Sequence, residues 1–285
     1  MSPHSGVGHL DSGTVTPLPI TFLSDYGIGD DFAGVCRAVI ARLAPGAQVV
    51  DITHGISRHD VRSGAAVLAD AVPFAPVGVH LAIVDPGVGG SRRAVAVRTE
   101  GEGHFLVGPD NGLLPPAIDV LGGAAEAVDI GDSQFRLEPA SATFHGRDLF
   151  SPVAAQLAAG AALGEVGSEI DPEGLERHVV SRPRLEQHRA FAHADRIDGF
   201  GNIALDLTAE ELRGHPLAGA GKVSIGSRSR RRSAIRCDSF GEVGDGSFLF
   251  YEDSSGRMAI AINRGNAAEG LEVRTGDELE LEPAP

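Results

Sequence analysis

The chain is poor in the residue types on which several kinds of protein chemistry depend. Its 285 residues include two cysteines, Cys36 and Cys237, and a single lysine, Lys222. Two cysteines cannot build a multiple-disulfide framework or a cysteine-rich zinc site. One lysine leaves almost no candidate for Schiff-base or P-loop chemistry. These absences favour a reducing compartment, and we expect a cytoplasmic protein.

Long apolar runs are also missing. No stretch of about 18 uninterrupted apolar residues occurs, and residues 1–17 lack the basic and apolar regions of a signal peptide. We therefore expect no membrane partner. Acidic residues number 39 against 24 lysines and arginines, which gives a formal net charge of −15. Because this charge repels phosphates, we expect no nucleic-acid partner.

One basic run departs from the acidic average. It extends from Arg228 to Arg236 and lies beside Gly and Ser residues. A nucleic-acid surface needs a wider positive footprint with interleaved aromatic side chains. We therefore interpret this run as a solvated loop.

The length and composition predict a globular protein with enough residues for two domains. Hydrophobic residues make up 42% and charged residues 22% of the chain. Residues 1–17 are rich in Gly, Ser, Thr and Pro, and we expect them to form a disordered leader. A polar stretch at residues 181–187 is the expected linker between domains at 18–180 and 188–285.

Strand-like and helical patterns alternate through residues 18–180. This alternation predicts an α/β domain with a mainly parallel sheet flanked by helices. The expected strands are Pro19–Leu23, Gln48–Ile52, Val79–Val84, Ala94–Arg98 and His104–Val107, and the expected helices are Asp31–Leu43, Asp60–Val72 and Arg147–Leu157.

The pattern changes after the linker to short β-like segments separated by Gly, Ser and Asp. We therefore expect residues 188–285 to form a smaller all-β barrel domain. The segments are Phe191–Ile197, Val223–Ile225, Ser247–Tyr251, Met258–Ile262 and Glu278–Leu281.

Ligands of open α/β sheets gather at the carboxyl ends of the strands, and a carboxylate-rich loop follows the first strand here. It contains Asp25, Asp30 and Asp31, whereas the third glycine of a dinucleotide-binding loop is absent after Gly27 and Gly29. Carboxylates suit ribose hydroxyls or a cationic group better than a phosphate. The alternative is simple N-capping of the helix by Asp30 or Asp31.

Two further polar clusters have functional and structural interpretations. The tight turn from Asp85 to Arg92 supplies a carboxylate and a guanidinium, although it could be only a β-connection. His145 comes just before a helix, where it could bind an anion or serve only in capping or packing. Another group has metal-ligating side chains without the spacing of a compact zinc site, and we expect no metal there: Asp51, His54, His59 and Asp60.

Five blocks in this order resemble one family, the S-adenosyl-L-methionine (SAM) hydroxide adenosyltransferases. The resemblance extends from about Ile20 to Glu280. The blocks are Phe22–Gly27 with Asp30 and Asp31, Val84–Gly89, Gly108–Gly112, Phe144–Asp148 and Ile197–Asn202.

The resemblance implies an α/β domain, a C-terminal β-barrel and a homotrimer with active sites between the first domain of one subunit and the second domain of its neighbour. It also implies a role for each matching residue. The residues expected to activate the water are Asp85, Arg92 and His145. The residues expected to bind the substrate are Asp25 for the ribose and Asp30 with Asp198 for the methionine ammonium. Asn202 with Phe200 is expected to bind the adenine, and Ser254 the methionine carboxylate.

Departures from the halogenating relatives of this family favour water as the nucleophile. Those enzymes resemble this chain but have a tyrosine in place of Asp85, a serine in place of Gly146, and an additional loop where only Thr99–Gly103 stands here. His59 takes the position of a pocket-closing aromatic residue. Ser255 takes the position of an arginine that follows the carboxylate-binding serine.

The resemblance thus implies that water attacks C5′ of SAM in an S_N2 reaction that yields adenosine and methionine. Methionine leaves a sulfonium as a neutral thioether, so no general acid, metal or cofactor is expected. A positioned base contributes roughly 10²–10⁴-fold to such a reaction. The sequence leaves open whether Arg92 lowers the pKa of the water or His145 removes its proton. A chloride-using halogenase and a non-catalytic SAM- or adenosine-binding module are the alternatives.

Overall fold

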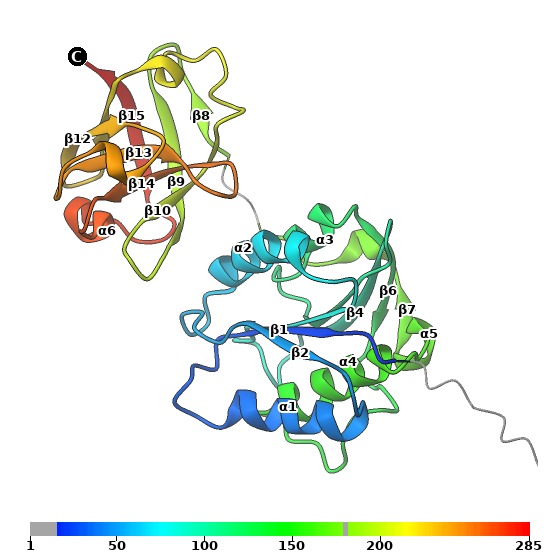
Figure 1. Cartoon of the computed structure of the whole chain (residues 1–285). Helices are drawn as coiled ribbons and strands as arrows, with labels where there is room; N and C mark the ends of the chain where they lie inside the picture. The colour runs from blue at the N-terminus through cyan, green and yellow to red at the C-terminus, as the bar shows by residue number, and fades with distance from the viewer. Residues whose placement is uncertain (1–15, 179–181) are drawn as a thin grey trace, which may run out of the picture. The chain divides into compact units, whose positions relative to one another are not determined.

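The computed structural model describes residues 16–178 and 182–285, and it divides the chain into two units between Arg177 and His178 (Figure 1). The predicted leader at residues 1–17 lies almost entirely outside the described residues. No helix in the described part of the chain is long and apolar enough to cross a membrane.

The first domain is built on a seven-stranded sheet. Its strands are β1 (Ile20–Ser24), β2 (Val49–Thr53), β3 (Val79–Ile83), β4 (Ala94–Thr99), β5 (Phe105–Pro109), β6 (Ala124–Asp129) and β7 (Ser168–Ile170). They lie in the order β2-β1-β3-β5-β4-β6-β7. The first four of this order are parallel neighbours, and β4, β6 and β7 extend the sheet through antiparallel pairs. The expected α/β class is confirmed.

Helices cover both faces of this sheet (Figure 1). They are α1 (Phe32–Leu43), α2 (Val61–Ala71), α3 (Pro115–Val120), α4 (Ser151–Ala158) and α5 (Leu163–Val166), with short turns η1 (Val72–Phe74), η2 (Gly146–Phe150) and η3 (Pro172–Gly174). Side chains of β3 alternate between the faces. Leu81 and Ile83 pack in the core that contains α1 and α4, whereas Ala82 packs in the core that contains α2 and α3.

The structure adds elements that the sequence pattern did not predict. The helix expected at Arg147–Leu157 begins as the π-helical turn η2, which continues into α4. Helix α3 and strand β6 were not predicted, and the sequence of β6, AAEAVD, has a weak alternation of apolar and polar residues. Strand β6 forms because β4 offers it a complete antiparallel edge.

The second domain is a closed barrel. Its strands are β8 (Arg184–Leu185), β9 (Ala190–Ile197), β10 (Ile203–Thr208), β11 (Lys222–Gly226), β12 (Arg231–Arg236), β13 (Phe248–Glu252), β14 (Arg257–Ile262) and β15 (Glu278–Ala284), with turns η4 (Pro216–Gly219) and η5 (Phe240–Glu242) and helix α6 (Ala267–Leu271). Seven strands close because β10 pairs with both β14 and β9. Strand β8 also pairs with β9, so part of the expected linker is a strand.

The expectation that residues 228–236 form a solvated loop is wrong. Residues 231–236 are the barrel strand β12, paired with β11 and β13. Arg230 forms an ion pair with Glu272, and Arg231 contacts Glu280 and Glu282 on β15 at 2.5 and 3.0 Å. Carboxylates of neighbouring elements therefore pair with two of the five arginines of the run.

A buried chain of polar side chains crosses the first domain. The hydroxyl of Thr21 lies 2.8 Å from Nδ1 of His80, whose Nε2 lies 2.8 Å from Nδ1 of His104. The two imidazoles stack with centroids 5.0 Å apart, and both are buried. Burial, and then the charge of His104, lowers the pKa of His80 to about 4.

We expect this histidine to make folding sensitive to mild acid. In the unfolded chain an imidazole binds a proton below about pH 6.5, whereas folded His80 stays neutral down to about pH 4. The unfolded state therefore binds more protons in this window, and stability falls by up to about 3 kcal/mol as the pH drops through it. Urea unfolding between pH 7 and 4 measures the slope, which His80→Gln should reduce. An equal slope in the variant would contradict this assignment.

Candidate functional site

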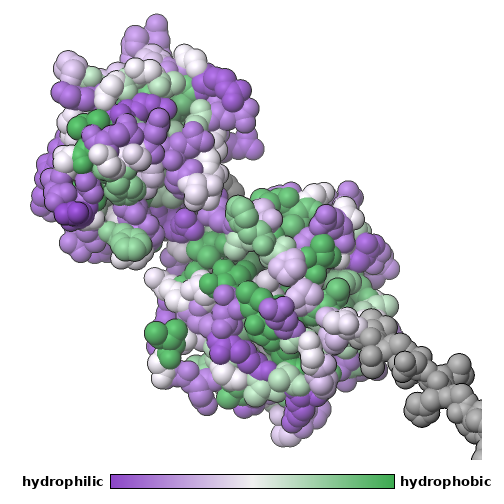
Figure 2. Space-filling view, in the orientation of Figure 1, coloured by the Kyte–Doolittle hydropathy of each residue, from purple (hydrophilic) through white to green (hydrophobic). Residues whose placement is uncertain are grey.

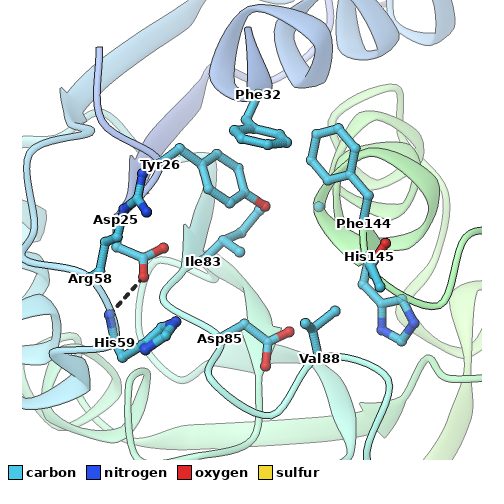
Figure 3. A pocket seen from close by; sticks show the side chains of 12 residues that line it. Asp25, Tyr26, Phe32, Arg58, His59, Ile83, Asp85, Val88, Phe144 and His145 are labelled. Atoms are coloured by element: carbon cyan, nitrogen blue, oxygen red, sulfur yellow. Dashed lines mark hydrogen bonds between the residues drawn. The ribbon is translucent and has the colours of Figure 1, made fainter. Parts of the chain in front are cut away.

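The first domain contains a cavity of about 250 Å³ at the carboxyl ends of β1 and β3 (Figure 3). Charged, aromatic and aliphatic side chains line it together. They are Asp25, Tyr26, Phe32, Arg58, His59, Ile83, Asp85, Val88, Thr143, Phe144, His145 and Gly146.

Two carboxylates enter this cavity because adjacent parallel strands end side by side. Ser24 of β1 pairs with Ile83 of β3, and Asp25 and Asp85 follow shortly after them. Oδ2 of Asp25 accepts a hydrogen bond of 2.9 Å from the backbone N–H of His59. His59 has a φ of +67°, a conformation that non-glycine residues adopt only under local constraint. The loops that carry Asp25 and Asp85 therefore lie together at the carboxyl edge of the sheet, as predicted.

Arg92 joins the second cluster to the third. Its Nε and Nη2 donate to the two oxygens of Asp85 at 2.9 and 2.5 Å, and Nη2 lies 2.9 Å from Nδ1 of His145. The side chains of Arg92 and Asp85 are only 11% and 7% exposed. The guanidinium also lies over the Phe150 ring, 5.2 Å from its centroid. A forked, largely buried pair of this kind has a fixed geometry.

This contact determines which nitrogen of His145 carries the proton of the neutral ring. Arginine has only N–H donors, so Nδ1 of His145 accepts from Arg92 and the proton of the neutral ring lies on Nε2. Burial, and then the neighbouring Arg92 charge, lowers the pKa of the His145 imidazole, although Asp85 acts in the opposite direction. The neutral ring therefore offers an Nε2–H donor.

Backbone contacts hold the turn from Asp85 to Arg92 in place. Gly89 has a φ of +74°, and a Cβ there would lie 2.5 Å from the carbonyl oxygen of Ala142. Glycine thus lets this turn approach the segment that leads to His145. On the other side, Nδ2 of Asn111 donates to the carbonyl of Val84 at 2.9 Å. The Gly108–Gly112 block therefore supports the site rather than lining it.

Helix capping was the structural alternative for Asp31 and for His145. The Asp31 side chain makes no capping hydrogen bond to α1, and that of His145 makes none to η2. Asp60 instead caps α2 by accepting from the N–H of Ser63 at 3.0 Å. Capping does not account for Asp31 or His145.

A second polar chain lies behind the Asp25 loop. Ser24 Oγ is 2.7 Å from Nδ1 of His54, and Nε2 of that ring is 3.1 Å from Asp51, which also accepts two hydrogen bonds from Arg37. The order resembles a nucleophile relay, but Ser24 is fully buried. Its Oγ accepts from the backbone N–H of Tyr26 at 3.3 Å. The chain thus fixes the loop that carries Asp25.

The metal interpretation of the Asp51–Asp60 region finds no geometric support. Within residues 16–178 and 182–285, no group of three or more His, Cys, Asp and Glu side chains is arranged to hold a metal ion. The expectation that the reaction needs no metal or cofactor stays a prediction.

The second domain has its own cavity of about 370 Å³. Three predicted binding residues line it: Asp198, Asn202 and Ser254. Asp198 accepts hydrogen bonds of 2.9 Å from the backbone N–H groups of Phe200 and Asn202 and from the Asn202 side chain. The carboxylate therefore shapes the loop that presents the Asn202 amide.

Three predicted residues lie outside the linings of both cavities. One is Arg92, which contacts two lining residues of the first cavity, Asp85 and His145. The Phe200 side chain is 80% exposed on the loop after β9. Asp30 lies on the exposed loop before α1, 3.8 Å from the guanidinium of Arg58, which does line the first cavity. Their predicted binding roles stay predictions.

Comparison with known proteins settles the ancestry of these two domains. Residues 20–167 match the SAM hydroxide adenosyltransferase N-terminal domain, and residues 192–280 match the C-terminal domain of that family. This chain belongs to the SAM hydroxide adenosyltransferase family.

Individual relatives agree with this membership of the SAM hydroxide adenosyltransferases. An (R)-S-adenosyl-L-methionine hydrolase of Salinispora tropica is 44% identical over 94% of this chain and 99% of its own length. A fluorinase of Actinoplanes is 25% identical over 90% of this chain and 95% of its own length. The crystal structure of an uncharacterized conserved protein from Thermotoga maritima superposes with a TM-score of 0.85, at 34% identity over 92% and 99% of the two chains.

Sequence reasoning missed several lining residues of this SAM hydroxide adenosyltransferase. Tyr26 and Val88 lie inside recognised blocks, whereas Arg58 directly precedes the singled-out His59. In the second domain the missed lining residues include Arg196 and Tyr251. Adjacency to a predicted residue was the available signal for the first three. Whether a residue lines the cavity depends on the direction of its side chain, which the sequence does not show.

We expect removal of Arg92 to raise the pKa of His145. Arg92→Leu deletes a positive charge next to the imidazole and leaves the Asp85 carboxylate nearby. The loss of the positive charge and the remaining negative charge both favour the imidazolium ion. NMR titration of His145 measures the shift. Arg93→Leu is the matched control because Arg93 pairs with Asp110 instead. An unchanged or lower pKa in Arg92→Leu would refute the contact.

Proposed function

We propose that this protein hydrolyses SAM to adenosine and L-methionine by S_N2 attack of water at C5′. The observation that carries the proposal is the buried Arg92 guanidinium, which joins Asp85 to His145 at a cavity that also contains Asp25. The hydrolase name of a relative at 44% identity supports the same reaction.

The charges of the first cavity suit this substrate. Two carboxylates, Asp25 and Asp85, line it and favour a sulfonium cation. In our proposal Asp25 also accepts hydrogen bonds from the ribose hydroxyls, while the N–H of His59 holds the carboxylate in place. A fixed carboxylate orients the ribose so that C5′ faces the nucleophile.

The nucleophile is held by donors rather than by a histidine base. In the proposed step, Nε2–H of neutral His145 and the Arg92 charge stabilise the developing hydroxide. The Asp85 carboxylate retains lone pairs beyond those that accept from Arg92, and it takes the water proton. The O–C5′ bond forms while the C5′–S bond breaks, the electron pair stays on sulfur, and one proton is released. No metal or cofactor takes part.

The remaining part of SAM needs the second domain. The 250 Å³ cavity is smaller than the roughly 300–1,000 Å³ typical of small-molecule sites. We assign the adenine to Asn202 with Phe200, the methionine carboxylate to Ser254, and the ammonium to Asp198 and Asp30. The Asn202 amide and Ser254 hydroxyl, which line the second cavity, support this assignment.

The assembly we propose is a homotrimer in which the first domain of one subunit and the second domain of a neighbour complete each site. Exposed apolar side chains next to both sets of residues support it. Ile28 is 95% exposed close to Asp25, and Phe200 is 80% exposed close to Asp198. Figure 2 shows further hydrophobic residues among polar ones on the visible face of the first domain. We place this enzyme in the cytoplasm, where its two free cysteines stay reduced.

Two other functions make different predictions. A halogenase would form 5′-chloro-5′-deoxyadenosine in the presence of chloride, and a binding module would retain SAM without turnover. Asp85 stands where the resemblance places a tyrosine in the halogenating enzymes, and the fluorinase relative is less similar than the hydrolase relative. Both observations favour hydrolysis.

Variants of His145 test the mechanism. Purified protein should release adenosine and methionine in equal amounts, and His145→Ala should lower kcat by about 10²–10³-fold, the usual loss for one donor to a developing oxyanion. His145→Gln should recover about tenfold of this loss because its amide N–H can replace Nε2–H. Equal activities of the Gln and Ala variants would instead favour a histidine base.

Mixed oligomers test the shared site. His145→Ala damages the first-domain part and Asn202→Ala the second-domain part, so each homo-oligomer should be nearly inactive. Co-expressed and purified together, the two variants should regain activity, because some sites then combine two intact domains. If each site lay within one chain, every site would carry one defect and the mixture would stay inactive.

A further inference from the structure

The phenol oxygen of Tyr26 lies directly against the backbone of Gly146. A Cβ built on Gly146 would overlap this oxygen, and it would lie 3.1 Å from Cζ of Tyr26 and 3.4 Å from Cδ1 of Ile83. The φ of Gly146 is not positive, so its backbone conformation does not itself require glycine. The need for glycine at this position comes from the Tyr26 side chain.

Neighbouring rings hold Tyr26 in this orientation. Its ring centroid lies 5.7 Å from that of Phe32 and 6.0 Å from that of Phe144, and those two rings meet edge to face at 5.2 Å. Oγ of Ser24 accepts from the Tyr26 backbone N–H at 3.3 Å. The phenol cannot swing away from Gly146 without disturbing this aromatic cluster.

The hydroxyl of Tyr26 is a neutral donor beside the proposed water-activating residues. Burial raises the pKa of the phenol far above its ordinary value, and the Asp25 and Asp85 carboxylates and the Cys36 thiol act in the same direction. Gly146 follows His145 directly in the chain, and both line the cavity together with Tyr26 and Asp85. A donor therefore lines the same small cavity as Asp85 and His145, the two partners of Arg92.

We infer that Tyr26 and Gly146 form a matched pair that completes the nucleophile subsite. The Tyr26 hydroxyl occupies the space in front of Gly146 and donates a hydrogen bond to the attacking water, in addition to the donor from His145. This inference rests on the proposed hydrolysis of SAM. It adds a residue to that reaction and gives the reason why position 146 has no side chain.

A double-mutant cycle separates the two parts of this inference. The variants are Tyr26→Phe, which removes only the phenol oxygen, Gly146→Ala, which adds only the Cβ, and the combination of both. Each is assayed for kcat and KM with SAM and for thermal unfolding without substrate. Gly34→Ala is the matched control for the added methyl group, because it adds a Cβ in α1 where no atom lies within 4 Å.

We expect Tyr26→Phe to lower kcat about tenfold with little change in KM, because the lost hydrogen bond serves the nucleophile rather than SAM. Gly146→Ala should lower both the Tm and kcat/KM. The same change should lower the Tm less in the Tyr26→Phe background, where the overlap with the phenol oxygen is gone and the 3.1 Å approach to Cζ remains. Gly34→Ala should lower neither kcat nor Tm, because alanine is the better helix former.

Failure of this inference can be distinguished from failure of the proposed function. An unchanged kcat in Tyr26→Phe, with active wild-type protein, would overturn the donor role while leaving hydrolysis intact. Equal effects of Gly146→Ala on the Tm in both backgrounds would overturn the matched pair. If wild-type protein did not hydrolyse SAM, the proposed function and the donor role would both be wrong.

Discussion

The need to pair a guanidinium that is shielded from water organises the first domain around Arg92. Only 11% of this side chain is exposed, so leaving its charge without a partner would be costly. Both carboxylate oxygens of Asp85 accept hydrogen bonds from the guanidinium, and Nδ1 of His145 accepts a further one. Two loops that are distant in the sequence are thereby fixed against each other. The tautomer of the histidine follows from this contact, and burial together with the Arg92 charge lowers its pKa.

The fold supplies the backbone for this contact. Parallel pairing of β1 with β3 places Asp25 and Asp85 at one edge of the sheet. Behind them, Asn111 binds the carbonyl before Asp85, and the Ser24–His54 contact fixes the loop of Asp25. These supporting residues do not line the cavity. They set the positions of groups that must act within a few tenths of an ångström.

Much of this arrangement could be predicted from the sequence, because apolar alternation and turn residues are local signals. Strands β1 and β3 and the clustering of Asp25 with Asp85 follow from such signals and from the rule for parallel sheets. The barrel strand β12 did not follow from local signals, because the carboxylates that pair with Arg230 and Arg231 come from residues about 40 to 50 positions away. The Tyr26–Gly146 contact was equally invisible, since it joins two residues 120 positions apart.

The central claim is that water attacks C5′ of SAM. Reaction in ¹⁸O-labelled water, followed by mass spectrometry of the products with and without chloride, tests it most directly. The account predicts one ¹⁸O atom in the 5′-hydroxyl of adenosine, unlabelled methionine, and no effect of chloride on the product. A 5′-chloro product, cleavage elsewhere in the substrate, or SAM that is bound but unchanged would contradict it.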